Sequence, residues 1–348
     1  MNTFFIEYRD PLFSVIIFFV LIFVIAFFSY WFGRYKKRED SKYLDRFLSG
    51  FRALPSHDEL KILISSGELS EKSWLLLAQS YFKNGDYEKS IEIYNELLNV
   101  KMQSNPRDTM FLLGRTYFKA GFLERARKIF LEILKTNPRT PQALGYLLLV
   151  YEYMREYKLA LEVLESLQEL EQDTSSDRAY IQALMLLNDA KKSSKEKAED
   201  LLKIYKETEL LSYMVFEYLF RTDPKLAWKH FDSSRSEQLV DLLWHLNAKD
   251  LDLDIISQNG YLRELFSARG ELKLANKSAV FEFDVLIKLE GKSNANLAFE
   301  YVCQSCKQAY PFAFHRCSAC HSIDTARVEF SLSKDYHRNV LEENNSFQ

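Results

Sequence analysis

The hydrophobic positions in the middle of the chain recur at helical spacing, and the pattern itself repeats. Three units share it, covering residues 71–100, residues 107–138 and a stretch that begins at 141. In each unit, two runs of apolar residues flank a short turn, which predicts two amphipathic helices. Because neither helix buries its apolar face alone, the units are expected to stack into a mainly α-helical superhelix with a concave surface.

The spacing and the small residues of the units identify the repeat. Equivalent tyrosines, Tyr81, Tyr117 and Tyr151, stand 36 and 34 residues apart. Ala78 and Gly114 occupy the eighth position of their units, where Leu148 departs from the pattern. The twentieth position is small in every unit: Ser90, Ala126 and Ala160. A period near 34 residues with these features resembles the tetratricopeptide repeat, in which small residues let the paired helices approach.

Helical patterns continue on both sides of these units. A first helix pair is predicted at 43–66 and a further pair at 177–205, with Ser193 or Ser194 as the N-cap of its second helix. The array is thus expected to cover residues 43–206. From 207 to 295 the register is lost, and degenerate helical repeats are predicted at 208–221, 225–231, 237–246 and 260–268. The segment 281–289 fits a strand and a helix equally.

All four cysteines of the chain stand within eighteen residues, as Cys303-x-x-Cys306 and Cys317-x-x-Cys320. Each pair places two sulfurs on one side of a tight turn, and two such turns supply a tetrahedron of soft ligands. This arrangement suits one Zn²⁺ or one iron ion. Residues 326–332 alternate as a strand, so residues 296–333 are expected to form a small β-rich metal ribbon.

Two other uses of the cysteines are less favoured. Two disulfides would suit a secreted domain, but this segment is expected to face the cytosol, where thiols stay reduced. A redox pair of the thioredoxin type needs only two cysteines and a surrounding βαβ pattern, which the sequence does not show. His315 and His321 flank the second pair and are expected to lie beside the metal ligands rather than among them.

The N-terminal part of the chain carries the second strong signal. No charged residue occurs from Leu12 to Phe32, and these 21 residues are long enough, at 1.5 Å each, to span the ~30 Å hydrocarbon core of a bilayer. We expect a transmembrane helix at 11–33, preceded by a short periplasmic N-terminus at 1–10. Four basic residues follow at once and predict a juxtamembrane linker at 34–42 that keeps the rest of the chain in the cytoplasm.

Composition excludes some classes of function. The net charge of −3 indicates no nucleic-acid partner, and the low numbers of glycine and proline, ten and seven, favour helices. The sequence contains no glycine-rich phosphate loop, no His-Glu-x-x-His motif and no Gly-x-Ser-x-Gly motif. No catalytic residue is therefore predicted, and the chain is interpreted as a non-enzyme. The last segment, 334–348, is expected to be a flexible tail.

One surface of the array is predicted to bind a partner. In tetratricopeptide arrays, positions 9, 12 and 13 of the first helix lie near the concave groove. The corresponding residues are Gln79, Phe82, Lys83, Arg115, Phe118, Lys119, Glu152 and Tyr153. Aromatic and basic groups together suit an extended or helical peptide with acidic and apolar residues. An equal alternative is that the C-terminal domain of the chain itself covers these rings.

The order of anchor, tetratricopeptide array and Cys₄ ribbon resembles the lipopolysaccharide assembly protein B family of Gram-negative inner membranes. The resemblance is closest at 117–167 and 301–320, where Tyr301, Gln304 and His315 accompany the cysteines as in the family's rubredoxin-like module. It implies a single-pass protein of the bacterial inner membrane with a cytoplasmic body. It also implies an adaptor that lowers lipopolysaccharide synthesis by bringing a lipid A biosynthetic enzyme to a membrane AAA protease, and that contacts other envelope-assembly proteins.

The sequence departs from that family at several positions. Lys307 and His321 stand where a glycine usually follows the second cysteine of each pair, and Ser318 replaces a usual proline. The metal site is expected to survive these changes, because the four ligands are intact. Two other functions stay open: a tetratricopeptide scaffold for another membrane-associated assembly, and a rubredoxin-like electron carrier. A homo-oligomer is compatible with each of these functions.

Overall fold

The structure is a computed structural model that describes residues 18, 20–25, 27–28, 57–66, 70–100, 106–270, 272–289 and 295–334. The predicted periplasmic segment 1–10, most of the predicted anchor 11–33, the linker 34–42, the part of the first helix pair before 57, and the tail beyond 334 lie outside these residues. Among the described residues, no helix combines the length and the apolar composition needed to cross a bilayer. The chain divides into two compact units, residues 1–150 and 151–348.

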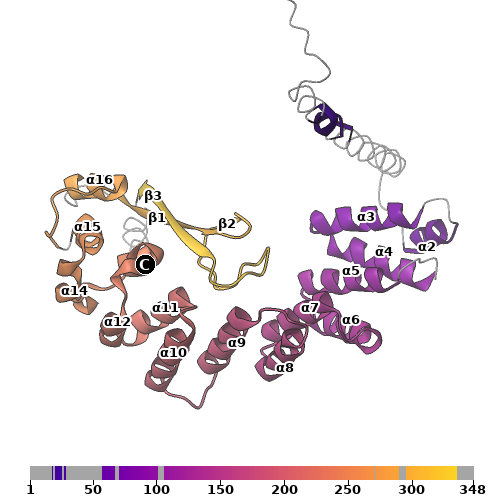
Figure 1. The fold of residues 1–348 in the computed structure, drawn as a ribbon, viewed down its shortest axis with the longest axis horizontal. Coiled ribbons are helices and arrows are strands. Elements are labelled where there is room, and N and C mark those ends of the chain that lie inside the picture. The colour runs from indigo at the N-terminus through magenta and orange to yellow at the C-terminus, as the bar shows by residue number, and fades with distance from the viewer. Residues whose placement is uncertain are drawn as a thin grey trace, which may run out of the picture. The chain divides into compact units, whose positions relative to one another are not determined.

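Helical hairpins build the first unit (Figure 1). Its helices are α2 (His57–Ser66), α3 (Glu71–Lys83), α4 (Tyr87–Asn99), α5 (Pro106–Lys119), α6 (Leu123–Thr136) and most of α7 (Pro141–Tyr153). The helices pack in chain order, α3 on α4, α4 on α5 and α5 on α6. Each predicted repeat in this unit is therefore one helical hairpin stacked on the next.

A left-handed residue closes the turn inside each hairpin. Gly85 and Gly121 have φ values of 84° and 82°, and Arg155 takes the same place in the third repeat with a φ of 60°. In all three turns, the next residue donates its N–H to the carbonyl of the repeat tyrosine at 2.8 to 2.9 Å. This hydrogen bond, from the second residue past the C-cap to the last turn of the helix, is the Schellman arrangement that ends a helix.

Small residues allow the paired helices to approach, as the sequence predicts. Ala78, Ala126 and Ala160 have no exposed surface. A Cβ added at Gly114 would stand 2.9 Å from the ring of Phe130, which is itself fully buried. Helix α5 therefore reaches this distance from α6 only because position 114 has no side chain.

The second unit contains further helices and a small sheet (Figure 1). Its helices are α8 (Tyr157–Gln168), α9 (Ser175–Leu187), α10 (Ser194–Thr208), α11 (Ser212–Thr222), α12 (Pro224–His230), α13 (Val240–Trp244), α14 (Leu253–Gln258), α15 (Gly260–Ala268) and α16 (Phe281–Leu289), with the 3₁₀ turns η1 (Ser233–Leu239) and η2 (Ala248–Asp250). Ser193 begins α10 with a capping box: its hydroxyl accepts the N–H of Glu196, whose carboxylate accepts the N–H of Ser193. Of the two N-caps predicted for this helix, Ser193 and Ser194, the capping box identifies Ser193.

Two helices differ from their predicted bounds. The helix predicted at 208–221 begins only at Ser212, because Glu209 and Leu211 have left-handed φ values of 56° and 64° and separate it from α10. The helix predicted at 237–246 is instead the 3₁₀ turn η1 followed by the five residues of α13.

A three-stranded antiparallel sheet forms near the end of the described chain. Strand β1 (Ala295–Cys303) lies between β2 (Ala309–Tyr310) and β3 (Ala326–Lys334). The register pairs Cys303 with Ala326 at one end and Ala295 with Lys334 at the other. Strand β3 confirms the strand predicted at 326–332.

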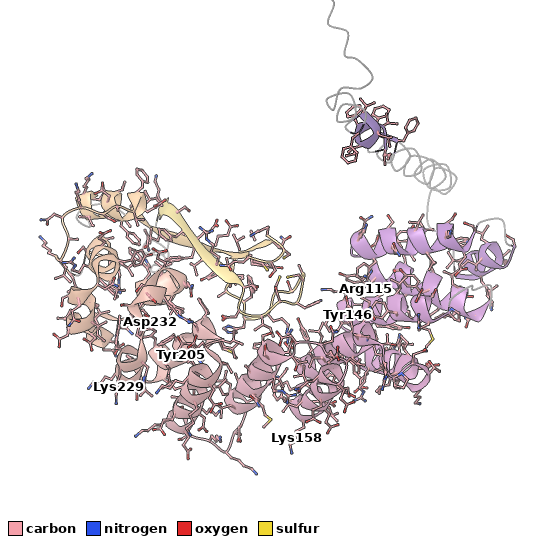
Figure 2. All side chains as sticks on the ribbon, in the orientation of Figure 1. Arg115, Tyr146, Lys158, Tyr205, Lys229 and Asp232 are labelled. Atoms are coloured by element: carbon pink, nitrogen blue, oxygen red, sulfur yellow. The ribbon has the colours of Figure 1, made fainter. Side chains whose placement is uncertain are left out.

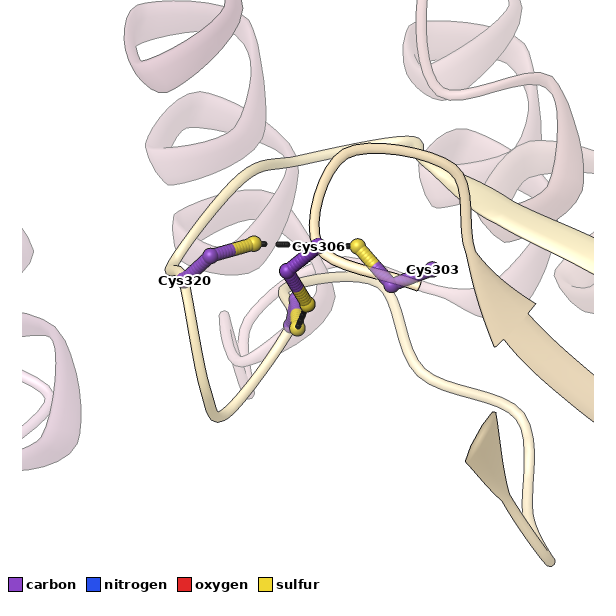
Figure 3. Close-up of side chains that lie close together, drawn as sticks. Cys303, Cys306 and Cys320 are labelled. Atoms are coloured by element: carbon purple, nitrogen blue, oxygen red, sulfur yellow. Dashed lines mark hydrogen bonds between the residues drawn. The ribbon is translucent and has the colours of Figure 1, made fainter. Parts of the chain in front are cut away.

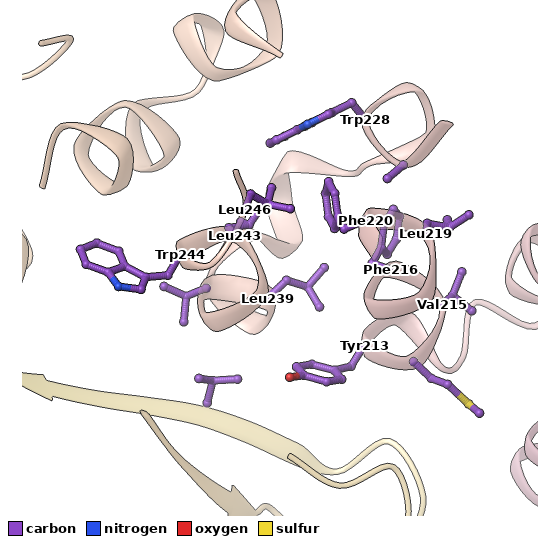
Figure 4. Close-up of a cluster of buried hydrophobic side chains, with 14 of the residues drawn as sticks. Tyr213, Val215, Phe216, Leu219, Phe220, Trp228, Leu239, Leu243, Trp244 and Leu246 are labelled. Atoms are coloured by element: carbon purple, nitrogen blue, oxygen red, sulfur yellow. The ribbon is translucent and has the colours of Figure 1, made fainter. Parts of the chain in front are cut away.

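One face of the sheet packs on the helices in a shared hydrophobic core (Figure 4). Leu297 of β1 and Val328 of β3 join the buried side chains of α11, α13 and α15. Helix α16 adds Leu286 and Phe283, whose ring stacks on Phe330 at a centroid distance of 5.3 Å. The two buried residues of α16 stand three apart, so the segment that fits both patterns in the sequence is a helix with one apolar face.

Replacing Gly114 by Ala should destabilise the chain by about 1–3 kcal/mol, because the added methyl group overpacks against Phe130. Gly145 of α7 is the matched control, since it has no positive φ and nothing stands within 4 Å of its Cβ position. Gly145→Ala should stabilise the chain by about 0.5–1 kcal/mol through helix propensity. Chemical denaturation measures both values, and equal effects at the two sites would contradict the packing argument.

Candidate metal centre and partner groove

Two turns of the same geometry hold the four cysteines. The carbonyl of Cys303 accepts the N–H of Lys307 at 2.8 Å, and the carbonyl of Cys317 accepts the N–H of His321 at 2.9 Å. Lys307 and His321 both have left-handed φ values, 62° and 64°. A glycine adopts this conformation without strain, whereas any other residue loses about 1 kcal/mol. The turns thus keep their shape although neither has the usual glycine.

These turns bring the four sulfurs into one cluster (Figure 3). All four Sγ atoms lie within 4.8 Å of one another. Cys303 and Cys320 are 3.6 Å apart, and Cys306 and Cys317 are 3.7 Å apart. A tetrahedron with metal–sulfur bonds of ~2.3 Å has edges of about 3.8 Å, whereas a disulfide requires a sulfur–sulfur distance of about 2.05 Å. The four cysteines therefore stand where a single tetrathiolate ion would place them.

Polar groups around the sulfurs support thiolates. The hydroxyl of Thr325 lies 3.3 Å from Sγ of Cys303, and that of Tyr310 lies 3.2 Å from Sγ of Cys317. Burial opposes the ionisation of Cys303, but Thr325 and the N–H of Cys306 outweigh it and lower the pKa of that thiol to about 5. At Cys306 a backbone N–H favours the thiolate, yet burial and the three neighbouring sulfurs raise its pKa to about 12. Four thiolates this close need a cation between them.

The donor set fits either ion that the sequence predicts. Thiolate ligands in a tetrahedron suit Zn²⁺ and iron alike, and one ion satisfies all four sulfurs. Because the protein fills all four coordination positions, none is left for water or a substrate. When bound, the ion supplies a cross-link that ties the end of β1 to the loop before β3.

Arg316, just before the third cysteine, joins this ribbon to the repeat helices. Its side chain is only 7% exposed. The guanidinium lies 2.8 Å from Glu152 of α7 and 2.9 Å from Asp177 of α9, and it covers the ring of Tyr180 at 5.0 Å. It also donates to the carbonyl of His321, at 2.9 Å, within its own turn. One cation thus binds two repeat helices and a metal-binding turn.

Burial and charge pairing shift the pKa values of the groups at this contact. Burial raises the pKa of Glu152, and Arg316 offsets part of that rise. For Arg316, burial lowers the pKa, but Glu152 and Asp177 outweigh it, so the net shift is upward. The sequence predicts Glu152 as a residue of the partner groove, and in the structure the ribbon of the same chain occupies its carboxylate.

Two more polar contacts hold the ribbon on the helices. Asp241 of α13 accepts hydrogen bonds from Tyr213 of α11 and, at 2.7 Å, from Tyr301 of β1. Burial and the Asp241 carboxylate raise the pKa of both tyrosines, which keeps their hydroxyls as donors. His315 lies 3.1 Å from Glu217, beside the metal ligands as expected. The sequence does not predict this role for Asp241, and its only sign there is a charged residue among apolar neighbours.

The aromatic part of the predicted groove is organised around Arg115. Its guanidinium stacks over Phe82 at 4.6 Å. It also hydrogen-bonds Tyr146 of α7, whose pKa is raised by burial and lowered in part by this cation (Figure 2). Phe118 is buried and packs edge-on against Tyr146 at 5.8 Å. Phe118 is thus a core residue of the first unit, and Phe82 is the accessible ring.

The remaining groove residues differ in exposure. Lys83 and Tyr153 are exposed, and Gln79 and Lys119 are half-buried. The accessible residues of α3 and α5 therefore include the cations Lys83, Arg115 and Lys119, of which Arg115 lies over the ring of Phe82 and Lys119 over that of Phe118. We call these three residues and Phe82 the cationic repeat face.

Comparison with known proteins identifies the repeats. The tetratricopeptide-repeat family matches residues 71–101 and residues 111–177. The chain contains a tetratricopeptide-repeat array, as the sequence predicts, and such an array is a scaffold for protein–protein interaction. Comparison with curated proteins returns no match.

Solved structures of repeat proteins are similar to parts of the chain. A fragment of MamA from Desulfovibrio magneticus is 21% identical, with a TM-score of 0.34, and the match covers 51% of this chain and 93% of that one. A tetratricopeptide repeat protein from Parabacteroides merdae is 13% identical, with a TM-score of 0.38 and coverages of 73% and 96%. PilF from Pseudomonas aeruginosa is 17% identical, with a TM-score of 0.31 and coverages of 68% and 91%. Likeness at this level carries no information about function.

The purified chain should contain about one equivalent of zinc or iron. Cys317→Ser should lose the ion and unfold the ribbon, because metal binding supplies folding free energy on the order of 10 kcal/mol in such sites. The repeats should stay helical by circular dichroism. Ser305→Ala, in the first turn but without a ligand atom, is the control and should keep the ion. Less than about half an equivalent of metal in an ordered wild-type ribbon would contradict the assignment.

Arg316→Ala should destabilise the second unit by about 3–5 kcal/mol, because it leaves Glu152 and Asp177 without a buried counter-charge. This loss of stability should become larger as the pH rises. Burial raises the pKa of Glu152, so without the arginine the folded state binds a proton that the unfolded state releases, and stability falls as pH rises.

Adding Glu152→Gln to Arg316→Ala should restore part of the stability and most of the pH independence. Denaturation at about pH 6 and about pH 8 measures both effects. Equal stability of the single and double variants at both pH values would contradict the argument that the unpaired carboxylate of Glu152 causes the loss.

Proposed function

We propose that this chain is a membrane-anchored adaptor without enzymatic activity, which binds one protein on its repeats and presents it to another at the membrane. The observation that carries the proposal is the cationic repeat face. Arg115 lies over the half-buried ring of Phe82, and Lys83 and Lys119 end the first helices of these two neighbouring repeats. The closed thiolate site supports a structural ribbon and offers no position for catalysis.

The chemistry of this face selects a class of partner. Arg115 is held over Phe82 and against Tyr146, so its charge is fixed in place before any partner arrives. A preorganised cation loses little conformational freedom on binding. An acidic peptide with an apolar side chain for the ring of Phe82 fits this arrangement.

The specific form of the proposal follows the resemblance to the lipopolysaccharide assembly protein B family. The client is a cytosolic enzyme of lipid A synthesis, the second partner is a membrane AAA protease, and the result is lower lipopolysaccharide synthesis. Supporting it is the order of apolar N-terminal segment, tetratricopeptide array and Cys₄ ribbon along the sequence. An anchor at 11–33 in the inner membrane would raise the local concentration of both partners around the cytoplasmic body.

Affinity purification of the full chain from detergent-solubilised membranes tests this function. The wild type should recover a membrane AAA protease together with a lipid A biosynthetic enzyme. Lys83→Glu with Lys119→Glu should reduce client recovery roughly tenfold, the equivalent of ~1.4 kcal/mol. Lys128→Glu with Lys135→Glu is the control, because these exposed lysines of α6 give the same change in net charge. Recovery of secretion or motility proteins instead would identify a scaffold for another assembly.

The orientation of the chain is tested separately. A reporter fused after Gln348 should be active in the cytoplasm, because the basic cluster after the apolar segment stays on that side. Activity only in the periplasm would contradict the proposed orientation. A chain without residues 1–33 should keep the melting behaviour of its repeats and lose the effect on lipopolysaccharide levels.

A further inference from the structure

Strand β3 has a free edge in the described part of the chain. The sheet order is β2-β1-β3, so β3 is bonded to β1 on one side only. It is nine residues long, and no proline or bulge interrupts it. Proteins normally protect edge strands of this length with such devices or cover them, because an open edge pairs with other chains.

The hydrogen-bond register shows which backbone groups face this edge. Gln304 donates its N–H to the carbonyl of Thr325 at 2.8 Å, so these two residues form a hydrogen-bonded pair. In an antiparallel ladder such pairs recur at every second position. Arg327 and Glu329 therefore direct their N–H and C=O groups toward β1. The residues between them direct theirs away from the sheet.

The outward groups belong to Ala326, Val328 and Phe330. Cys303, the partner of Ala326 in the register, confirms the alternation, since it donates its N–H to Gln308 on the β2 side. Among the described residues, no hydrogen bond joins the outward backbone groups of Ala326, Val328 and Phe330 to another residue. The edge thus offers a row of backbone donors and acceptors in strand geometry.

A cleft of about 860 Å³ borders this edge. Ala326, Arg327, Val328 and Phe330 line one side of it, and residues of η1, among them Ser234 and Gln238, line another. Three consecutive residues of β3 contribute, whereas a cleft over one face of a strand would be lined by alternate residues. The cleft therefore follows the edge, and its volume lies within the ~300–1,000 Å³ range of ligand sites.

The lining determines what fits. Arg235 and Arg327 are balanced by Glu237 and Asp324, so the cleft selects no net charge. Tyr261 and Val280, both half-buried, add apolar surface. A strand placed ~4.8 Å from β3 would direct alternate side chains toward these residues and the others toward solvent. Because η1 packs beside β3, a single extended chain reaches the edge more readily than the sheet of a second folded copy.

We propose that the edge of β3 is a docking site for an uncharged, extended segment of a partner protein in which apolar and polar residues alternate. The segment adds to the sheet as a fourth strand, with backbone hydrogen bonds to Ala326, Val328 and Phe330. The site uses none of the residues of the cationic repeat face, so this inference does not rest on the proposed adaptor function.

The probe is a blocked peptide of alternating serine and valine, about seven residues long so that it spans the edge at ~3.3 Å per residue. It is titrated into the full-length chain and followed by fluorescence anisotropy and amide hydrogen exchange. The amides of Val328 and Phe330 should exchange at least about tenfold more slowly with the peptide, while those of Arg327 and Glu329, already bonded to β1, should not change. A peptide methylated at every amide nitrogen should not bind.

Val328→Pro removes one donor from the edge and leaves the ladder to β1 intact, because the N–H of residue 328 faces the cleft. It should weaken peptide binding at least about fivefold relative to Val328→Ala, which keeps the N–H. Gln238→Trp fills the cleft from η1 and should also prevent binding. Metal content and melting temperature show whether each variant is folded.

Three results would overturn the proposal. In the first, folded Val328→Pro and Gln238→Trp bind the peptide as well as wild type. In the second, the amides of Val328 and Phe330 are already slow in the full chain and become fast in a chain ending at Lys334, which would make the last residues of the chain itself the occupant. In the third, the same amides slow with rising protein concentration alone, which would make a second copy the occupant.

Discussion

A single buried cation connects the metal ribbon with the repeats. Arg316 lies between Glu152 and Asp177, and its guanidinium also binds the carbonyl of His321 in its own turn. The next residue, Cys317, is a candidate metal ligand. The position of the cation therefore depends on a turn that an ion bound by the four cysteines would hold in place. Without that turn, nothing fixed offsets the cost of burying the carboxylate of Glu152.

The ribbon also explains why the repeat register ends after α10. Helix α11 still packs on α10, but its buried side chains share one hydrophobic core with α13, α15 and the sheet. The break occurs at Glu209 and Leu211, whose left-handed backbone redirects the chain. Asp241 then binds Tyr213 of a helix and Tyr301 of a strand. After α11 the helices are short and share their core with the sheet, and the 34-residue period is lost.

Local patterns explain what the sequence predicts well. The repeat period, the small residue at Gly114 and the two cysteine turns belong to motifs that recur along the sequence, and the structure contains each of them. The sequence does not predict contacts between residues that are far apart along the chain. Arg316 and Glu152 are far apart in the sequence, and neither is unusual in its own surroundings. The segment 281–289 satisfies both periodicities, and the burial of Phe283 and Leu286, three residues apart, becomes apparent only in the folded chain. Phe118 looks like a groove residue until Tyr146 covers it.

The residues with left-handed backbone show that different interactions can offset the same conformational strain. Lys307 and His321 each lose about 1 kcal/mol relative to glycine, while a structural metal contributes on the order of 10 kcal/mol. A bound ion would therefore outweigh the strain of both turns, which would make glycine dispensable there. Arg155 stands in a turn without a metal ligand. Its strain is offset instead by the helix-ending hydrogen bond from the N–H of Glu156 to the carbonyl of Tyr151 and by the packing of the repeat. These contributions are smaller than that of a structural metal. In the first two repeats, Gly85 and Gly121 adopt the same conformation without this strain.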